Sequence, residues 1–337
     1  MSYPPTSTAN PTGLRGAGGG RTVAAMSLDV RPLGSTGRNV SVMALGSWRT
    51  FERIPRSQGI EVMKAARAAG VTMLDDARYT DETGTAPIPT GYSEVVFGEL
   101  FRAAGFERDE VTVSNKLWWE FWPEEDAVTE VRGSLGRMGF ASLDLLYAIC
   151  PPSGLEVSTV VEQIGRVFDA GLARAWGTGM WSAAQHEEAL DCCERLGVPG
   201  PVVAQMACSL VDHEAATSSE MTAAFTRGGI GLVAAYVLAG GALSGKYLSS
   251  HAGRVADDLS PAVVAAKIAA AGLVDLAAEV GATPSQLAFC YALAQPHLTS
   301  VLFGATTSDQ VRENVGAVDV LASLTPSQLT QLHDLAR

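Results

Sequence analysis

One lysine stands at the end of an apolar run and directly before a group of aromatic residues. Residues 111–122 read VTVSNKLWWEFW, and Lys116 is one of only four lysines in the chain. Asp75 likewise follows an apolar run, VTML. A lysine that leaves water needs a carboxylate partner to keep its charge. The two residues are therefore expected to pair where two strands end.

A tyrosine four residues after Asp75 adds a group that can move a proton. A phenol has a pKa of about 10, and an adjacent cation that stabilises the phenolate lets it donate a proton near neutral pH. Asp75, Lys116 and Tyr79 are thus predicted to form a proton relay with Tyr79 as the donor. A structural alternative stays open, in which Asp75 caps a loop, Lys116 is a surface lysine and Tyr79 packs at a rim.

Eight short runs of β-type residues alternate with amphipathic helical stretches along the chain. They lie at 42–45, 72–74, 111–114, 143–149, 173–178, 202–205, 231–235 and 300–303. Strand and helix repeated eight times predict a parallel (β/α)8 TIM barrel, whose chemistry lies at the C-terminal ends of the strands. A β-hairpin is expected within 31–42, and extra helices at 261–280 and 326–336 are expected outside the barrel.

Length and composition favour a single barrel domain at 27–337. The chain has 337 residues, 47% of them hydrophobic, and residues 1–26 are predicted to be a disordered tail because they lack the apolar core of a signal peptide. A net charge of −12 argues against nucleic-acid or anionic-membrane partners. No apolar run reaches the roughly 18 residues that span a bilayer. The expected partner is a small-molecule substrate, and the oligomeric state stays open.

The cysteines and histidines predict no metal and no disulfide framework. Five cysteines include no CxxC pair, and the five histidines show no metal-ligand spacing. A reducing, cytoplasmic location fits this pattern best.

Nine segments, in order along residues 31–335, resemble the aldo-keto reductases, and in particular the branch of that family that is similar to potassium-channel β-subunits. They read LGSTGRNVSVMALGSW, AARAAGVTMLDDARY, YSEVVFGELF, VTVSNK, LGRMGFASLDLLY, GLARAWGTGMWS, GGALSGKY, TPSQLAFCYAL and VLFGATTSDQVRENVGA. The resemblance implies a (β/α)8 barrel that holds NADPH in an extended pose. It also implies hydride transfer to a carbonyl group while a tyrosine delivers the proton.

The resemblance assigns cofactor-binding roles to particular residues. Asp75 and Lys116 match the paired Asp and Lys of the family, and Gln205 matches the glutamine that holds the nicotinamide carboxamide. Further cofactor positions are Tyr236 as the stacking ring, Leu238, Lys246, and an adenine and phosphate clamp of Gly304, Thr306, Gln310, Glu313 and Asn314 at a helix N-terminus. Arg254 and Arg312 are candidates for the 2'-phosphate, because a guanidinium binds that group with two hydrogen bonds. The preference for NADP over NAD stays open.

Several positions depart from the family pattern. The family tyrosine stands five residues after the aspartate, so Tyr79 is one position early and Tyr92 is a second candidate donor. Ile149 stands where the family places a histidine or an asparagine, and losing one such donor costs roughly 10²- to 10³-fold in rate. Gly179 and Met180 replace polar residues that grip the carboxamide.

An aromatic group is expected to form the substrate pocket. Trp118 and Trp119, with Phe121 and Trp122 beside them, are predicted to build an apolar wall with Trp48 and Ile149 for a bulky or ring-containing substrate. Their alternative role is to pack the loop onto the barrel. Cys150 is a weak donor and is expected to point to the other side of its strand.

Three functions follow from these features. The first is an NADPH-dependent reductase of a carbonyl, an imine or a conjugated enone in specialised metabolism, since an apolar Ile149 suits a substrate that is already activated. The second is an NADP(H)-binding regulatory or scaffolding subunit with little catalysis. The third is a redox-neutral elimination or isomerisation enzyme that uses bound nicotinamide transiently.

Overall fold

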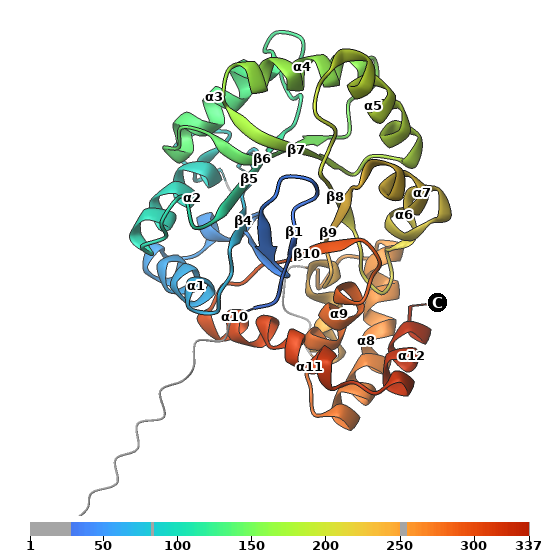
Figure 1. The fold of residues 1–337 in the computed structure, drawn as a ribbon. Helices are drawn as coiled ribbons and strands as arrows, with labels where there is room; N and C mark the ends of the chain where they lie inside the picture. The colour runs from blue at the N-terminus through green and yellow to red at the C-terminus, as the bar shows by residue number, and fades with distance from the viewer. Residues whose placement is uncertain (1–27, 82–83, 250–254, 337) are drawn as a thin grey trace, which may run out of the picture.

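Eight parallel strands form a closed barrel surrounded by helices (Figure 1). The computed structural model describes residues 28–81, 84–249 and 255–336, so the expected tail at 1–26 and Arg254 lie outside the described residues. Around the barrel the strands follow the order β10-β3-β4-β5-β6-β7-β8-β9. They are β3 (Met43–Gly46), β4 (Met73–Asp75), β5 (Thr112–Leu117), β6 (Leu143–Ile149), β7 (Ala173–Gly179), β8 (Val203–Ala207), β9 (Gly231–Ala235) and β10 (Leu298–Phe303). The predicted (β/α)8 fold is confirmed.

The helices pack around the strands, and a group of them extends the barrel on one side. They are α1 (Arg56–Ala68), α2 (Tyr92–Ala103), α3 (Ala127–Met138), α4 (Val157–Asp169), α5 (Ala183–Leu196), α6 (Glu214–Thr217), α7 (Ser219–Gly228), α8 (Pro261–Val280), α9 (Pro284–Leu293), α10 (Ser308–Val315), α11 (Ala317–Ser323) and α12 (Pro326–Asp334). Short 3-10 turns are η1 (Phe51–Arg53), η2 (Ala239–Ser244) and η3 (Lys246–Leu248). Helices α8 and α12 are the extra helices that the sequence predicts, and they lie side by side at the lower right of Figure 1.

Local sequence explains where several of these helices begin. Ser182, Thr283 and Thr325 each accept a hydrogen bond from the third residue of the following helix, and the glutamine at that position returns a bond to the cap backbone. This reciprocal arrangement satisfies two backbone N–H groups that the helix itself leaves free. A proline at the first turn of α8, α9 and α12 adds a fixed helical φ.

An N-terminal hairpin closes one end of the barrel. Strands β1 (Val30–Pro32) and β2 (Asn39–Ser41) pair antiparallel, and the Ser41 N–H donates to Thr72 Oγ1 at 2.9 Å, just before β4 begins. Leu33 and Val40 pack into the interior cluster of the barrel. The hairpin therefore covers the N-terminal ends of the strands, and the opposite end remains for loops that carry chemistry.

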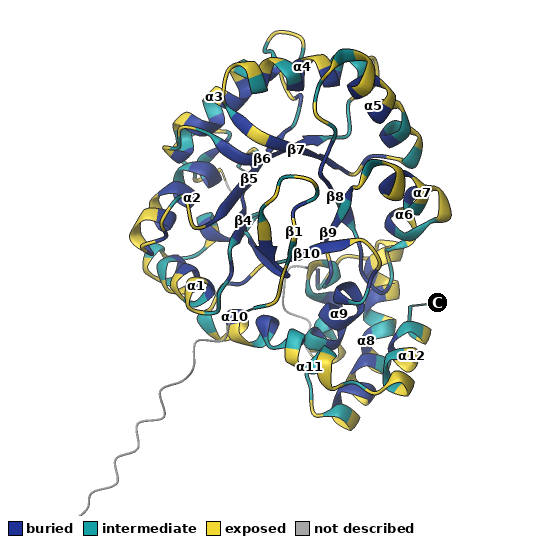
Figure 2. Cartoon of the chain, in the orientation of Figure 1, coloured by how far each residue is buried: buried dark blue, intermediate teal, exposed yellow. Residues whose placement is uncertain are grey.

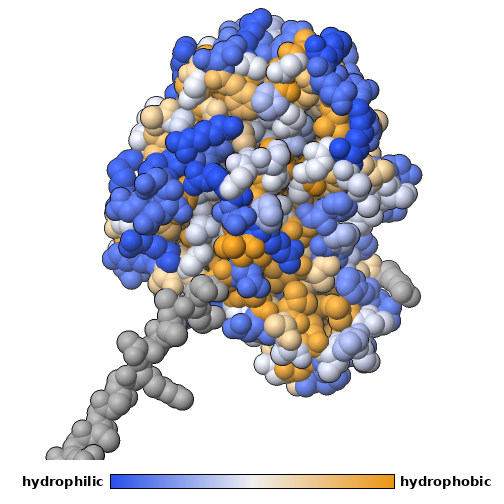
Figure 3. Space-filling model, viewed as in Figure 1, coloured by the Kyte–Doolittle hydropathy of each residue, from blue (hydrophilic) through white to orange (hydrophobic). Residues whose placement is uncertain are grey.

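Side chains alternate between the barrel interior and the layer beneath the helices. Figure 2 shows the strands almost wholly buried, with exposed residues on the outer helix faces. Met73, Leu145 and Tyr147 belong to the interior cluster, whereas Leu74 and Leu146 pack in the larger core under the helices. Figure 3 shows hydrophobic residues gathering at the lower right. Helix α8 exposes Val264, Ile268 and Val274.

Strand β5 runs further than the sequence predicts. The apolar pattern ends at residue 114, but ladder pairing continues to Leu117, so Lys116 lies inside the strand instead of after it. Asp75 pairs in register with Ser114, and Lys116 lies two residues beyond Ser114 on the same face. Both side chains consequently point into the barrel, near its C-terminal end.

Candidate active site

Asp75 and Lys116 form a buried ion pair at the C-terminal end of the barrel. Lys116 Nζ donates to Asp75 Oδ2 and, at 2.8 Å, to the backbone oxygen of Asp76. Ser114 Oγ donates to Asp75 Oδ1 at 2.6 Å. Asp75 is 4% exposed and Lys116 6%. A buried charge that keeps its partner is stable, whereas the loss of either partner strands the other charge away from water.

Two further side chains touch this pair from the barrel interior. Gln205 Nε2 donates to Asp75 Oδ2 at 3.3 Å, and Gln205 itself is half-buried at the open end. Lys116 Nζ lies 5.6 Å from the ring centroid of Tyr147, its register partner on β6. Burial, and next to it the charge of Asp75, raise the pKa of the Tyr147 phenol well above its usual value. Tyr147 was not singled out from sequence, although its spacing of two from Ile149 marks an inward position.

Tyr79 lies against the loop after β3. The backbone N–H of Arg49 donates to Tyr79 Oη at 2.8 Å. Burial, and then a hydrogen bond and the charge of Glu52, raise the pKa of the Tyr79 phenol above its usual value. The sequence predicted the opposite direction, a pKa lowered by Lys116. The shorter loop between Asp75 and Tyr79 directs the hydroxyl toward residues 49–52, and Lys116 is not among the described residues that it contacts.

The second candidate donor, Tyr92, lies elsewhere. It is the first residue of α2, and its hydroxyl accepts a hydrogen bond of 2.9 Å from Arg56 on α1. The Arg56 guanidinium also lies 5.5 Å from the Tyr92 ring centroid and pairs with Glu99. The Tyr92 hydroxyl is thus engaged between two outer helices and not at the ion pair.

Ile149 and Gly179 are linked by geometry. They are register partners on β6 and β7, and a Cβ added to Gly179 would lie 2.5 Å from Ile149 Cδ1. The space that a side chain at 179 would occupy is therefore filled by Ile149. Ile149 and Gly179, which both depart from the family pattern, therefore change the shape of the barrel mouth together. Met180, next to Gly179, is exposed and has a positive φ of 61°.

Cys150 points away from this mouth. Its Sγ contacts the side-chain amide of Gln185 on α5, at 3.6 Å from Nε2 and 3.8 Å from Oε1. The alternation of side chains along β6 explains this direction, as the sequence predicted.

Asp76 is a buried carboxyl group that sequence reasoning missed. It is 0% exposed, and Ser47 Oγ donates to its Oδ1, while Oδ2 has no hydrogen-bond partner among the described residues. Burial, and next to it the charge of Glu94 on α2, raise the pKa of Asp76 well above its usual value, although Ser47 and Lys116 act in the other direction. The folded protein therefore favours the protonated form of this group.

Asp76→Asn is expected to make the protein more stable relative to wild type as the pH rises from about 4 to 8. The unfolded chain loses the Asp76 proton near pH 3.8, whereas the folded protein keeps it, so wild-type stability falls as the pH rises toward the folded pKa. Asparagine does not ionise, and the difference should grow by up to about 1.4 kcal/mol per pH unit. Urea unfolding at several pH values measures it.

Asp126→Asn is the control for this experiment. Asp126 caps α3 by accepting the Thr129 N–H, and its pKa is lowered by hydrogen bonds to Thr129. Its carboxylate is ionised in both states above pH 5, so its difference from wild type should stay constant between pH 5 and 8. Parallel pH profiles for Asp76→Asn and wild type would show that Asp76 ionises normally.

The aromatic loop after β5 is held against the barrel. Trp119 is buried, its Nε1 donates to Ile149 O at 3.1 Å, and its ring meets Trp122 edge-on at 6.0 Å between centroids. Trp118 is half-buried and Phe121 is exposed. Trp119 therefore packs the loop onto the barrel, whereas Trp118 and Phe121 lie nearer the solvent.

Residues with a left-handed backbone gather at the same end of the barrel. Arg49, Trp119, Met180 and Tyr236 have positive φ values between 51° and 63° and follow β3, β5, β7 and β9. Non-glycine residues in this conformation carry strain, and such residues concentrate at functional sites. Their clustering marks the C-terminal end as the functional face.

Tyr236 and Trp48 meet across the mouth. Their ring centroids are 5.5 Å apart at an interplanar angle of 75°, and Tyr236 is 48% exposed. Leu238 is half-buried at the start of η2. Lys246 Nζ lies 4.8 Å from the Tyr247 ring centroid and is exposed. An exposed ring and an exposed cation thus follow the end of β9.

The segment after β10 is organised by its own side chains. Gln310 Oε1 accepts from the Thr306 N–H at 2.7 Å, and buried Asn314 donates to Gly304 O at 3.4 Å. Thr283 Oγ1 donates to Glu313 Oε1 at 2.8 Å. Arg312 pairs with Asp309 on the surface. Gly304 and Thr306 therefore precede α10, Gln310 lies in its first half, and Glu313 and Asn314 lie in its second half.

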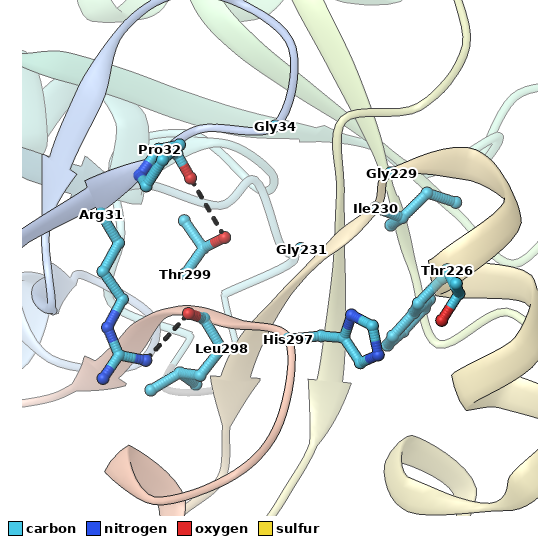
Figure 4. Close-up of a pocket in the computed structure, with 11 residues that line it drawn as sticks. Arg31, Pro32, Gly34, Thr226, Gly229, Ile230, Gly231, His297, Leu298 and Thr299 are labelled. Carbon is cyan, nitrogen blue, oxygen red and sulfur yellow. Dashed lines mark hydrogen bonds between the residues drawn. The ribbon is translucent and has the colours of Figure 1, made fainter.

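A cavity of about 470 Å³ lies at the other end of the barrel (Figure 4). Arg31 points along it, but its guanidinium donates to Leu298 O at 2.9 Å, and Thr299 Oγ1 donates to Pro32 O at 3.4 Å. His297 lines the same cavity and is exposed. Its polar groups are largely engaged within the protein, and the cavity lies beside the hairpin, away from Asp75 and Lys116.

A (β/α)8 barrel with a buried acid–lysine pair at its C-terminal mouth defines the class of this protein. The chain belongs to the aldo/keto reductase family, whose model matches residues 42–337. It is 30% identical over 329 residues to a probable voltage-gated potassium channel subunit beta of Arabidopsis thaliana, covering 91% of this chain and 96% of that protein. A protein of the same description from Oryza sativa subsp. japonica is 31% identical over 325 residues, covering 90% and 95%. The resemblance seen in the nine segments is confirmed.

Within residues 28–81, 84–249 and 255–336, no helix has the length and apolar character needed to cross a membrane. The same residues contain no group of three or more His, Cys, Asp or Glu side chains arranged to hold a metal ion.

Members of the family generally bind NAD(P)H, and the residues at the open end fit such a group. Gln205 presents a half-buried carboxamide beside Asp75, and Tyr236 presents an exposed ring. Gly304 is an exposed residue without a side chain, held through its carbonyl by Asn314 at α10. An amide, a flat ring and a helix N-terminus with accessible backbone are the features that a nicotinamide dinucleotide needs.

Proposed function

We propose that this protein is an NADPH-dependent oxidoreductase that reduces a carbonyl, imine or conjugated enone in a bulky or ring-containing small molecule. The observation that carries the proposal is the buried ion pair of Asp75 and Lys116 next to Gln205 at the mouth of the barrel. A fully paired charge in a low-dielectric site is costly to build and is a common feature of catalytic centres.

The cofactor is expected to lie along the open end. Gln205, Tyr236 and Leu238 would hold the nicotinamide half, with Gln205 binding its carboxamide. The adenine and phosphate half would be held by Lys246, Gly304, Thr306, Gln310, Glu313 and Asn314. Arg312 would bind the 2'-phosphate if its guanidinium gives up its pairing with Asp309. NADPH, when bound, supplies the hydride.

Tyr79 is the proposed proton donor. The Arg49 N–H fixes the Tyr79 oxygen in place, and the raised pKa makes the free phenol a weak acid, so proton transfer would need positive charge brought to Oη when substrate and cofactor bind. The Lys116 ammonium, oriented by Asp75 and by the backbone of Asp76, supplies positive charge near the developing anion. Tyr92 is the less favoured donor because Arg56 engages its hydroxyl.

An activated substrate fits the apolar mouth. Ile149 offers no hydrogen bond to a substrate oxygen. Its side chain occupies the space that a side chain at Gly179 would fill. An iminium is already cationic, and hydride addition to the β-carbon of a conjugated enone spreads the developing charge over an enolate, so both need less help from a donor than a simple ketone does. Trp48 and Trp118 are half-buried and Phe121 is exposed, and they would form apolar walls for a ring.

Cofactor binding and turnover can be measured in one cuvette. NADPH is expected to quench tryptophan fluorescence, and absorbance at the nicotinamide band should then fall when cyclic imines or enones are added, and more slowly with simple ketones. Fast turnover of simple aldehydes with none of imines or enones would contradict the substrate class. Absence of NADPH binding would contradict the function itself.

The names of the relatives favour a second function. Both are described as probable voltage-gated potassium channel subunits beta, and the likeness covers nine-tenths of the chain. An NADP(H)-binding regulatory or scaffolding subunit would bind NADPH without oxidising it in the presence of any substrate in the panel. A redox-neutral elimination or isomerisation enzyme would convert substrate while the nicotinamide absorbance stays constant.

A further inference from the structure

Arg78 is a buried arginine next to the proposed proton donor. It is 3% exposed and lies in the loop between β4 and α2. Its Nη2 donates to Glu130 Oε1 on α3 at 2.8 Å and lies 3.3 Å from Glu120 Oε2. Its guanidinium carbon is 5.2 Å from the ring centroid of Phe121. Charge, hydrogen bonding and ring contact thus converge on one side chain.

Each of these partners of Arg78 bears on the aromatic loop, residues 118–122. Glu120 and Phe121 belong to the loop itself, and Glu130 Oε1 also accepts the backbone N–H of Trp118 at 2.8 Å. The loop is therefore fastened to the guanidinium directly at Glu120 and Phe121, and at its start through Glu130. A planar guanidinium can lie against a ring while its N–H groups bind carboxylates, whereas an ammonium has no flat face to stack.

The contacts of Trp119 tie the same loop to the substrate position. Trp119 Nε1 donates to the backbone oxygen of Ile149, so movement of the loop would move the end of β6. Arg78 is bonded in sequence to Tyr79, so its guanidinium joins the donor loop and the aromatic wall in one unit.

We propose that Arg78 is a positioning residue that sets substrate selectivity, by holding the aromatic loop as the wall of the pocket in a fixed relation to Tyr79. This proposal rests on the reductase function proposed above. Arg78 does not touch the reacting atoms, and its effect should be confined to ring-containing substrates that reach the wall.

The test uses two variants that weaken the contacts of Arg78 with the aromatic loop, and one control variant. Glu120→Gln removes the exposed charge partner and leaves the buried Arg78–Glu130 pair intact, so the fold is retained. Arg78→Lys keeps the charge and the capacity to donate, but it loses the planar group that lies against the Phe121 ring. Glu124→Gln makes the same charge change in the same connection between β5 and α3, at an exposed residue that is not among the described partners of Arg78.

Hydrogen–deuterium exchange of peptides covering residues 117–126 is the first readout and needs no activity. Exchange is expected to rise about 2- to 5-fold in Glu120→Gln and about 10-fold in Arg78→Lys, with Glu124→Gln equal to wild type. Equal exchange in the wild type and the three variants would overturn the proposal that Arg78 holds the aromatic loop in place. Because the readout is independent of turnover, this failure is distinct from failure of the reductase function.

Steady-state kinetics at saturating NADPH is the second readout. KM for a ring-containing imine or enone should rise about 2- to 5-fold in Glu120→Gln and further in Arg78→Lys, while KM for a small aldehyde stays unchanged. Equal shifts for both substrates, or equal shifts in Glu120→Gln and Glu124→Gln, would overturn the role in selectivity.

Discussion

Lys116→Met is expected to lower kcat by about 10²- to 10⁴-fold while NADPH binding stays near that of the wild type. The substitution removes the only positive charge that meets Asp75 and the Asp76 backbone oxygen at the mouth, among the residues that the structure describes. In the proposed mechanism the negative charge that develops on the substrate would then lack a buried cation, and the pH dependence of kcat should disappear. The measurements are kcat across pH 5 to 10 and the Kd for NADPH from tryptophan quenching.

The control for this variant separates chemistry from folding. Methionine leaves Asp75 buried and unpaired, which costs about 3 to 5 kcal/mol of stability. The double variant Asp75→Asn with Lys116→Met removes both charges and is expected to regain much of that stability, as measured by its urea midpoint, without regaining activity. Wild-type turnover in the well-folded double variant would show that the ion pair is structural.

The barrel and the place of its chemistry were predictable because both follow from short-range patterns. Strands buried on both faces read as apolar runs, and β6 and β9 have the predicted bounds. Polar residues at the ends of strands lie at the mouth of such a barrel, so Asp75, Lys116 and Gln205 could be assigned there from the strand pattern, whereas Ile149 was singled out through the family resemblance.

What the sequence did not reveal depends on contacts between distant residues or on loop geometry. Arg78 and Glu130 are 52 positions apart, and no local pattern links them. The 2.5 Å approach of a Gly179 Cβ to Ile149 depends on strand register. The Tyr79 hydroxyl is directed by a loop, where one residue fewer changes which neighbour it meets. Asp76 follows Asp75 directly, and only its burial distinguishes its chemistry.

Ile149→His is expected to raise kcat/KM for simple ketones by about 10²-fold, up to 10³-fold, because it restores a hydrogen-bond donor to the substrate oxygen. Residue 149 lies on the inward face of β6 in register with Gly179, which has no side chain, so an imidazole can replace the isoleucine without meeting a Cβ there. Turnover of a cyclic iminium, which has no oxygen to bind, should not rise. The measurement is kcat/KM for both substrates in parallel at neutral pH.

Ile149→Leu is the matched control, since it keeps the apolar character and the volume. Its ratio of ketone to iminium turnover should equal that of the wild type, whereas the ratio in Ile149→His should shift by the gain on the ketone alone. If the histidine variant gained equally on both substrates, the effect would come from pocket shape and not from a donor. If it gained on neither, the reacting oxygen would have to lie away from the end of β6, and the activated-substrate proposal would lose its structural basis.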